Sequence, residues 1–173
     1  MSENIQIRYA ERGDIYDIAA FLHDSWQAEY RQIIKDDYLD TMSVDERHKG
    51  LLIRYDGLAS EFFMMFDGEK LIGVAIFGDS FTKGYEDDGE ISAIYVHRDY
   101  TGEGHGRRLI SKAESALREK GFVNLVLDLL ADNERALRFY QASGYRKAAD
   151  RTIRLGENDY PLSVMRKCAC NTS

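Results

Sequence analysis

A strand, a glycine-rich loop, a helix and a second strand follow one another in the chain, and this order restricts the fold more than any other feature. Residues 90–97 alternate as a strand does and run into three glycines within residues 102–106. An apolar stripe over residues 109–117 has helical spacing. The apolar run 123–130 predicts a buried strand. Two strands joined through a helix predict one parallel pairing.

The flanking segments predict antiparallel strands and further helices. Strands are expected at residues 5–9, 62–66, 71–77, 145–155 and 160–167. Asp67-Gly68 joins the second and third of these and is a strong hairpin signal. Helices are expected at about 15–26, from Ser43, which has capping-box spacing to Glu46, and at about 133–143. The expected fold is α/β: a mostly antiparallel mixed sheet with helices on both faces, in one domain spanning 1–173.

Composition and charge exclude several classes of function. The chain has 173 residues, of which 44% are hydrophobic and 31% charged, as in globular proteins. Its net charge of −7 argues against a nucleic-acid partner. No apolar run is long enough to span a membrane and the start lacks signal-peptide features, so a cytoplasmic location is expected. Cys168 and Cys170 have no metal-ligand partners nearby, so they are predicted to be free thiols and no metal site is expected.

The glycine-rich loop is suited to bind an anion. It comprises Thr101, Gly102, Glu103, Gly104, His105, Gly106 and Arg107. Glycines let the backbone approach a ligand closely, and the first amides of a helix have no intrahelical partner. A phosphate or pyrophosphate fits such a site. The spacing matches neither the dinucleotide fingerprint nor the P-loop, and a plain turn into a helix is the alternative for the loop taken alone.

A second candidate half-site lies on the helix expected from residue 133. Asn133 and Tyr140 are seven residues apart and share one helix face, with the small Ala136 between them. An amide, a small side chain and a phenol in line suit an extended ligand with amide groups and a reactive end. The alternative is that Asn133 is only an N-cap and Tyr140 only an aromatic at the edge of the core.

Together the two stretches resemble the GNAT superfamily of acetyl-CoA-dependent N-acetyltransferases. The family's loop, Gln/Arg-x-x-Gly-x-Gly/Ala, is matched over residues 101–106. Its motif Asn-x-x-Ala-x-x-Phe-Tyr-x-x-x-Gly-Phe/Tyr is matched over residues 133–145. Thr101 stands where the family has Gln or Arg, which puts one side-chain contact to a pyrophosphate in doubt. The resemblance is specific from about Glu90 to Tyr145 and extends more weakly to the order of the elements.

The resemblance implies an acetyl-CoA site with a definite layout. The amides of residues 102–107 would hold the pyrophosphate. The main chain of Ile94, Tyr95 and Val96 would pair with pantetheine in a gap where the parallel strands splay apart. The Val96 amide would polarise the thioester carbonyl, and Asn133 would hydrogen-bond to the pantetheine arm.

The resemblance also implies residues that move protons. The family assigns its general acid to the tyrosine at Tyr140, and some members place a general-base glutamate at Glu90. Strict alternation would turn Glu90 and Val96 to the same side of the strand. The alternative is that Glu90 belongs to a solvated acidic turn with residues 86–88. The expected reaction is direct acetyl transfer to a primary amine in a ternary complex, and an inactive acetyl-CoA-binding regulatory module is the alternative.

The acceptor site is expected at the first helices, which often line the acceptor pocket in this family. Trp26 and Tyr30 are the candidate substrate-binding residues, beside the carboxylate of Glu29. Aromatic rings with carboxylates suit a cationic amine, whereas ordinary amphipathic packing is the alternative. A small-molecule amine or polyamine is expected rather than a protein, and a homodimer is left open.

Overall fold

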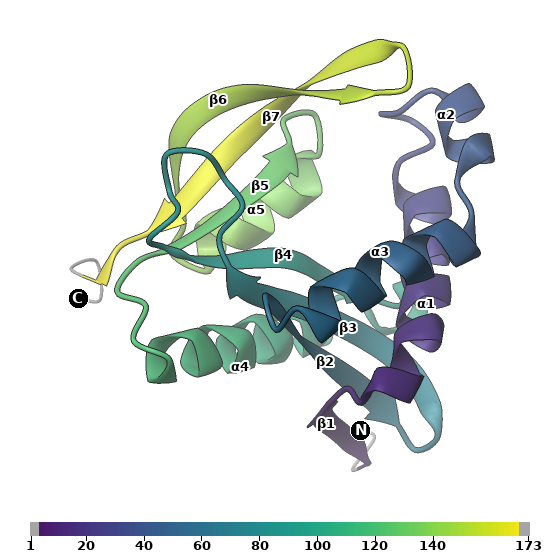
Figure 1. Ribbon diagram of the computed structural model, residues 1–173, viewed down its shortest axis with the longest axis vertical. Coiled ribbons are helices and arrows are strands. Elements are labelled where there is room, and N and C mark those ends of the chain that lie inside the picture. The colour runs from purple at the N-terminus through teal and green to yellow at the C-terminus, as the bar shows by residue number, and fades with distance from the viewer. Residues whose placement is uncertain (1–3, 170–173) are drawn as a thin grey trace.

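The sheet of the computed structural model, which describes residues 4–169, has seven strands in the order β1-β2-β3-β4-β5-β7-β6 (Figure 1). The strands are β1 (Ile5–Tyr9), β2 (Ser60–Asp67), β3 (Lys70–Asp79), β4 (Gly89–Val96), β5 (Leu125–Leu130), β6 (Arg146–Leu155) and β7 (Asn158–Lys167). Neighbouring strands are antiparallel except for β4 and β5, which are parallel. The predicted mixed sheet with one parallel pair is therefore confirmed.

Helices cover both faces of this sheet, as predicted. They are α1 (Ile15–Glu29), α2 (Asp36–Thr41), α3 (Val44–Asp56), α4 (His105–Glu119) and α5 (Glu134–Ala142). One apolar core forms between α1, α3 and one face of β2 and β3, and another forms under α4 and α5 on the opposite face. Because β2 and β3 are covered on both faces, their sequences are apolar almost throughout instead of alternating.

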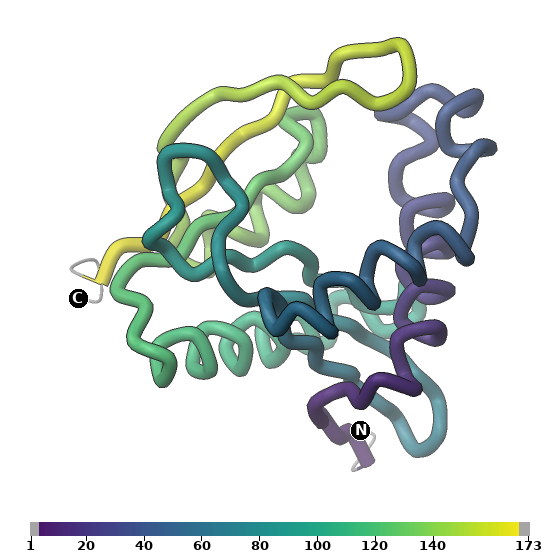
Figure 2. The backbone as a smooth tube through the Cα atoms, viewed as in Figure 1, coloured from purple at the N-terminus to yellow at the C-terminus, as the bar shows by residue number. Residues whose placement is uncertain are grey.

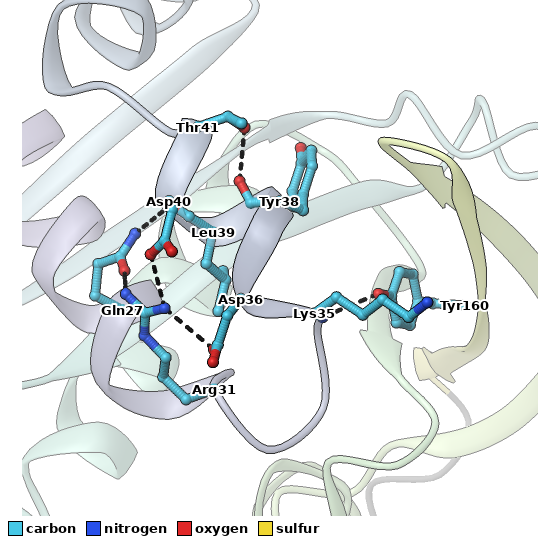
Figure 3. Close-up of polar contacts among 9 residues, drawn as sticks. All are labelled: Gln27, Arg31, Lys35, Asp36, Tyr38, Leu39, Asp40, Thr41 and Tyr160. Carbon is cyan, nitrogen blue, oxygen red and sulfur yellow. Dashed lines mark hydrogen bonds and ion pairs between the residues drawn. The ribbon is translucent and has the colours of Figure 1, made fainter.

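Helix α2 is a third helix between β1 and β2, where the sequence predicts only two. It has six residues, of which only Leu39 is buried, so it has no apolar periodicity to reveal it. Contacts with the preceding segment hold it in place (Figure 3). Gln27 Nε2 donates to the Leu39 carbonyl at 2.7 Å, and the Arg31 guanidinium pairs with Asp36 and Asp40. The helix therefore depends on tertiary contacts more than on its own sequence.

The segment before α2 also contacts the hairpin formed by β6 and β7. Figure 2 shows the two segments side by side, although they lie at opposite ends of the chain. The Lys35 amide donates to the Tyr160 hydroxyl at 3.0 Å. A Cβ on Gly156, at the tip of the hairpin, would lie 3.2 Å from the Tyr38 ring. A third apolar core, which includes Tyr30, Leu39, Leu155 and Tyr160, joins the hairpin to α1 and α2 here.

The predicted cap of α3 is confirmed. The Ser43 hydroxyl accepts from the Glu46 amide at 3.1 Å and begins a helix of thirteen residues, which is longer than the short helix expected. Within residues 4–169 no helix is long and apolar enough to cross a membrane. Cys168 is a free thiol, whereas Cys170 lies outside the described residues.

The parallel pairing of β4 with β5 extends over only two residue pairs. Gly89 is opposite Leu125, and Glu90 is opposite Val126. Beyond them β4 continues along β3 and β5 continues along β7. The two strands therefore separate towards their C-terminal ends, as the family resemblance implies.

A β-bulge at Ser92 interrupts the alternation within β4. Ala93 pairs with Ile76 and Ile91 pairs with Phe77, so Ser92 is one extra residue on this strand. A bulge changes the face to which the preceding side chains point. The alternation assumed for residues 90–96 therefore does not hold across residue 92.

The bulge turns Glu90 away from Val96, so the prediction that the two face the same way is wrong. Ile91 belongs to the core under α4 and α5, and Ile94 and Val96 pack against that core. Tyr95 packs against the core under α1 and α3. Glu90, next to Ile91, therefore faces the α1 and α3 side.

Gly78 in β3 allows the chain entering β2 to approach closely. A Cβ at this position would lie 2.2 Å from the Ala59 carbonyl oxygen and 2.9 Å from the Ser60 Cα. Because both atoms belong to the backbone, we expect Gly78→Ala to lower the free energy of unfolding by about 1–3 kcal/mol in urea denaturation.

Gly50 in α3 provides the matched control. No atom lies within 4 Å of a Cβ built there, so Gly50→Ala should raise the free energy of unfolding by about 0.5–1 kcal/mol. A Gly78→Ala variant as stable as the parent protein would contradict the close approach of the two strands.

Candidate active site

The loop between β4 and α4 presents unpaired amides at the start of a long helix. Gly102 and Gly104 have φ angles of 83° and 86°, which favour glycine. The Arg108 amide donates to the Gly104 carbonyl at 3.1 Å and makes the first turn of the helix. The preceding helical amides, at residues 105–107, have no acceptor within the helix. They lie at the positive end of a fifteen-residue helix dipole, which suits an anion.

Gly106 serves packing between the two motif-bearing helices. A Cβ on this residue would lie 3.2 Å from the Phe139 ring of α5 and 3.9 Å from the Val96 side chain. The absence of a side chain therefore lets α4, α5 and the end of β4 meet. This role differs from that of Gly104, which has open space around it and a left-handed backbone.

The end of β4 presents main-chain amides to the gap beside β5. The His97 amide donates to the Ile72 carbonyl on β3 at 2.7 Å. Successive amides of a strand point to opposite edges, so the Val96 and Ile94 amides point away from β3 and towards the gap. The pairing between β4 and β5 has already ended at Glu90. An extended ligand with amide groups could bind this edge like an added strand.

Asn133 is the N-cap of helix α5, as the alternative interpretation of this residue has it, and its role in cofactor binding stays a prediction. Asn133 Oδ1 accepts from the Ala136 amide at 3.1 Å. Seven residues later, Tyr140 is buried to about nine tenths. Within residues 4–169 its hydroxyl has no hydrogen-bond partner, and burial raises the pKa of Tyr140.

These elements surround a cavity of about 380 Å³. It is lined by Glu29, Ile94, Tyr95, Val96, Tyr100, Thr101, Gly102, Gly104, Gly106, Arg107, Asn133, Arg135, Ala136, Phe139 and Tyr140. Most residues predicted to bind a cofactor are therefore brought together. Of those predicted, Glu103 and His105 do not line the cavity: His105 is buried, with its Nε2 3.1 Å from Glu103 Oε2.

Glu29, the last residue of α1, lies in this cavity and also lines a neighbouring cavity of about 620 Å³. Glu29 is exposed at the protein surface, but the surrounding atoms reduce the hydration of its carboxyl enough to raise the pKa of Glu29, against the lowering effect of Arg135. Its charge also acts on the hydroxyl of Tyr140. No sequence motif includes Glu29, so its place in the cavity follows only from the fold.

Glu90 does not line either of these cavities. Its Oε2 atom accepts hydrogen bonds from the Ser80 hydroxyl at 3.0 Å, the Phe81 amide at 2.8 Å, and the amide and hydroxyl of Thr82 at 3.2 and 3.1 Å. The carboxylate therefore holds the loop after β3.

The acidic run before Glu90 is not a uniformly solvated turn either. Asp88 is buried, and its two oxygens accept from the Arg166 guanidinium at 2.7 and 2.9 Å. Bidentate pairing of this kind fixes the start of β4 against β7. The expected alternative for Glu90, a solvated acidic turn over residues 86–88, therefore does not describe Asp88.

Trp26 and Tyr30, predicted to bind the acceptor, lie directly behind the cavity wall. The Tyr30 and Tyr95 hydroxyl oxygens are 2.8 Å apart, and Tyr95 lines the cavity. The Trp26 ring packs edge-on against Tyr30, with centroids 4.7 Å apart, and the Arg47 guanidinium lies 5.1 Å from the Trp26 ring. Neither residue lines the cavity itself.

Two parallel strands of the sheet separate beside the unpaired amides at the start of a helix. This arrangement is the one expected for the acyl-group transferases that the two motifs predict. The acetyltransferase (GNAT) family matches residues 19–145 of the chain. The chain therefore belongs to the GNAT family of acetyltransferases and is an N-acetyltransferase of that family.

Individual relatives agree with this assignment. The chain is 32% identical over 148 residues to the uncharacterized N-acetyltransferase YuaI of Bacillus subtilis, covering 84% of this chain and 83% of that protein. It is 30% identical to the uncharacterized N-acetyltransferase Rv2669 of Mycobacterium tuberculosis, covering 68% and 67%. The structure of PaiA N-acetyltransferase from Thermoplasma acidophilum, in complex with coenzyme A, superimposes with a TM-score of 0.74 at 20% identity, over 95% of this chain and 98% of that one.

Proposed function

We propose that the protein transfers the acetyl group of acetyl-CoA directly to a primary amine of a small molecule. The observation that carries this proposal is the cavity at the separated ends of β4 and β5, which continues to the unpaired amides of α4. Structures of similar fold agree with the cofactor: PaiA was solved with coenzyme A and YncA of Salmonella typhimurium with acetyl-CoA. A small amine agrees with a third, a spermidine N-acetyltransferase chimera.

In this proposal the cofactor lies along the cavity from α4 to α5. The amides of residues 105–107 hold the pyrophosphate, with Arg107 adding positive charge. The Ile94 and Val96 amides bind the pantetheine carbonyls, and the Asn133 amide group binds the same arm. Thr101 provides only a hydroxyl where the family has a longer side chain, so the main chain carries most of the pyrophosphate binding.

Acetyl transfer requires that the amine first lose a proton. An aliphatic amine with a pKa of about 10.4 arrives protonated at neutral pH. Glu29 is the carboxylate that lies in the cavity with Tyr140, and its raised pKa makes it a stronger base. We therefore propose Glu29 as the proton acceptor. The sequence predicts Glu90 as the general base instead. Its hydrogen bonds to residues 80–82 favour a role in holding the loop after β3.

The free amine then attacks the thioester carbonyl, and the Val96 amide stabilises the oxyanion of the tetrahedral intermediate. Collapse of the intermediate breaks the carbon–sulfur bond and releases the CoA thiolate, and the second proton on the attacking nitrogen passes to solvent, which leaves the neutral amide. Since burial raises the pKa of Tyr140, complete proton transfer to a thiolate with a conjugate-acid pKa of about 8.5 is uphill. A hydrogen bond from the Tyr140 hydroxyl to the developing thiolate still stabilises the transition state.

The cofactor assignment predicts that acetyl-CoA raises the melting temperature of the protein. Gly104→Val should greatly weaken this binding, because a branched residue at a φ of 86° costs about 1–3 kcal/mol and displaces the helix amides. Gly121→Val is the matched control: Gly121, after the other end of α4, has a φ of 98° and open space around it. It should lose similar stability and keep its affinity.

Calorimetric titration of acetyl-CoA measures these affinities, and release of free thiol with a panel of amines measures transfer. Equal affinity of Gly104→Val and the parent protein would exclude the amide site at α4. Tight binding without thiol release for any amine would support the inactive-module alternative.

The general-acid assignment predicts that Tyr140→Phe loses turnover and not cofactor affinity. The substitution keeps the buried ring, and the thioester sulfur accepts a hydrogen bond strongly only when it carries charge. We expect kcat to fall by about 10²–10⁴-fold with little change in the KM for acetyl-CoA. Steady-state kinetics with a saturating amine test this. A raised KM with nearly unchanged kcat would instead assign the hydroxyl to pantetheine binding.

The two candidate bases are separated by their pH profiles. A base acts only when deprotonated, so activity should fall as pH drops through the raised pKa of Glu29. Glu29→Gln should lower kcat/KM by about 10²–10⁴-fold and remove this acidic limb of the profile. Glu90→Gln should retain the limb. The reverse result, in which only Glu90→Gln removes the limb, would assign the base to Glu90.

A further inference from the structure

Arg47 in α3 carries a partly buried charge without a counterion. Within residues 4–169 its Nε atom is buried and has no hydrogen-bond partner. The guanidinium also forms no ion pair with any described carboxylate. Its two terminal nitrogens are not among the buried atoms, so they can reach water or a ligand. A partly buried cation without a counterion is a suitable partner for an anionic ligand that can reach it.

Arg54 on the same helix is a second partly buried guanidinium, and for this one the chain provides hydrogen-bond partners. It lies seven residues after Arg47, and burial lowers the pKa of both guanidinium groups. Arg54 donates to the Ser60 and Ser92 hydroxyls at 3.0 and 2.8 Å, and the Glu90 charge acts on it. No comparable partners surround Arg47 in the described part of the chain.

Arg47 does not line the two cavities described above, but it lies among aromatic residues next to one of them. Its guanidinium lies over the Trp26 ring, and the groups that act on its charge are the hydroxyls of Tyr95, Tyr38 and Tyr30. Burial raises the pKa of Tyr95 and Tyr30, so these phenols stay neutral and provide no negative charge. Tyr95 also lines the cavity that holds Glu29 and Tyr140.

We propose that Arg47 binds a carboxylate carried by the acceptor, so that the substrates are amines with a carboxylate on the same small molecule, of which amino acids are the simplest. This rests on the proposed acetyl transfer. The planar guanidinium matches a carboxylate through two parallel hydrogen bonds, and the aromatic rings beside it can pack against an apolar side chain of the substrate. Because the Arg47 guanidinium covers one face of the Trp26 ring, a cationic amine cannot bind to that face.

The test compares acceptors that differ only in this charge. The standard L-amino acids, their primary amides and spermidine are offered with acetyl-CoA, and kcat/KM is measured by thiol release. We expect an amino acid to be preferred over its own amide by about 10- to 100-fold, as for a hydrogen bond to a charged group. Arg47→Met should reduce this preference to about onefold without changing the Kd for acetyl-CoA.

Arg154→Met is the matched control, because Arg154 is an exposed residue of β6 that pairs with Asp159 at the surface. It should retain the full preference. If Arg47→Met does not fold, Arg47→Lys serves, since it keeps the charge but loses the bidentate geometry and should reduce the preference. Equal use of acids and amides, preference for spermidine, or an unchanged preference in the Arg47 variants would overturn the proposal.

Failure of the proposed function is a separate result. It would appear as no binding of acetyl-CoA or no thiol release with any amine. Calorimetric binding of the same amino acids and amides to the protein saturated with coenzyme A still tests Arg47, since it needs no turnover. Tighter binding of the acid than of the amide, lost in Arg47→Met, supports the carboxylate site, and equal binding overturns it.

Discussion

The early end of the β4–β5 pairing is the constraint on which the site depends. Two residue pairs hold the strands together, and each strand then follows its other neighbour. The separation leaves the Ile94 and Val96 amides without a strand partner while the rest of the sheet stays paired. Backbone groups at such an edge must find a partner or remain in water. An extended ligand with amide groups satisfies them, so the fold itself creates the binding edge.

The bulge at Ser92 distributes functions between the two faces of β4. Before it, Glu90 faces the α1 and α3 side and holds the loop over residues 80–82. After it, Val96 packs against the core under α4 and α5, close to Gly106. The N-terminal end of β4 therefore stabilises a loop, and its C-terminal end lines the cavity. Strict alternation would have placed a carboxylate among the apolar contacts of that core.

Local patterns were sufficient to predict the glycine loop, the Asn133 cap, the hairpin at Asp67-Gly68 and the one parallel pairing, because each depends on neighbours in sequence. The bulge at Ser92 and helix α2 were missed because both depend on distant partners. Glu29 and Arg47 were missed for a similar reason. Each is an ordinary charged residue on a helix, and only the packing of α1 and α3 against the sheet brings Glu29 to the cavity and Arg47 over the Trp26 ring.

Loss of hydration favours the neutral form of three ionisable groups on which the proposals depend, Glu29, Tyr140 and Arg47, and the chemical result differs for each. It raises the pKa of Glu29, which strengthens the carboxylate as a base. It raises the pKa of Tyr140, which keeps the phenol protonated, as the proposed hydrogen bond to sulfur requires. It lowers the pKa of Arg47, but a guanidinium is not deprotonated in proteins. Arg47 therefore stays charged, and the carboxylate of the proposed substrate would supply the counterion that the described residues do not.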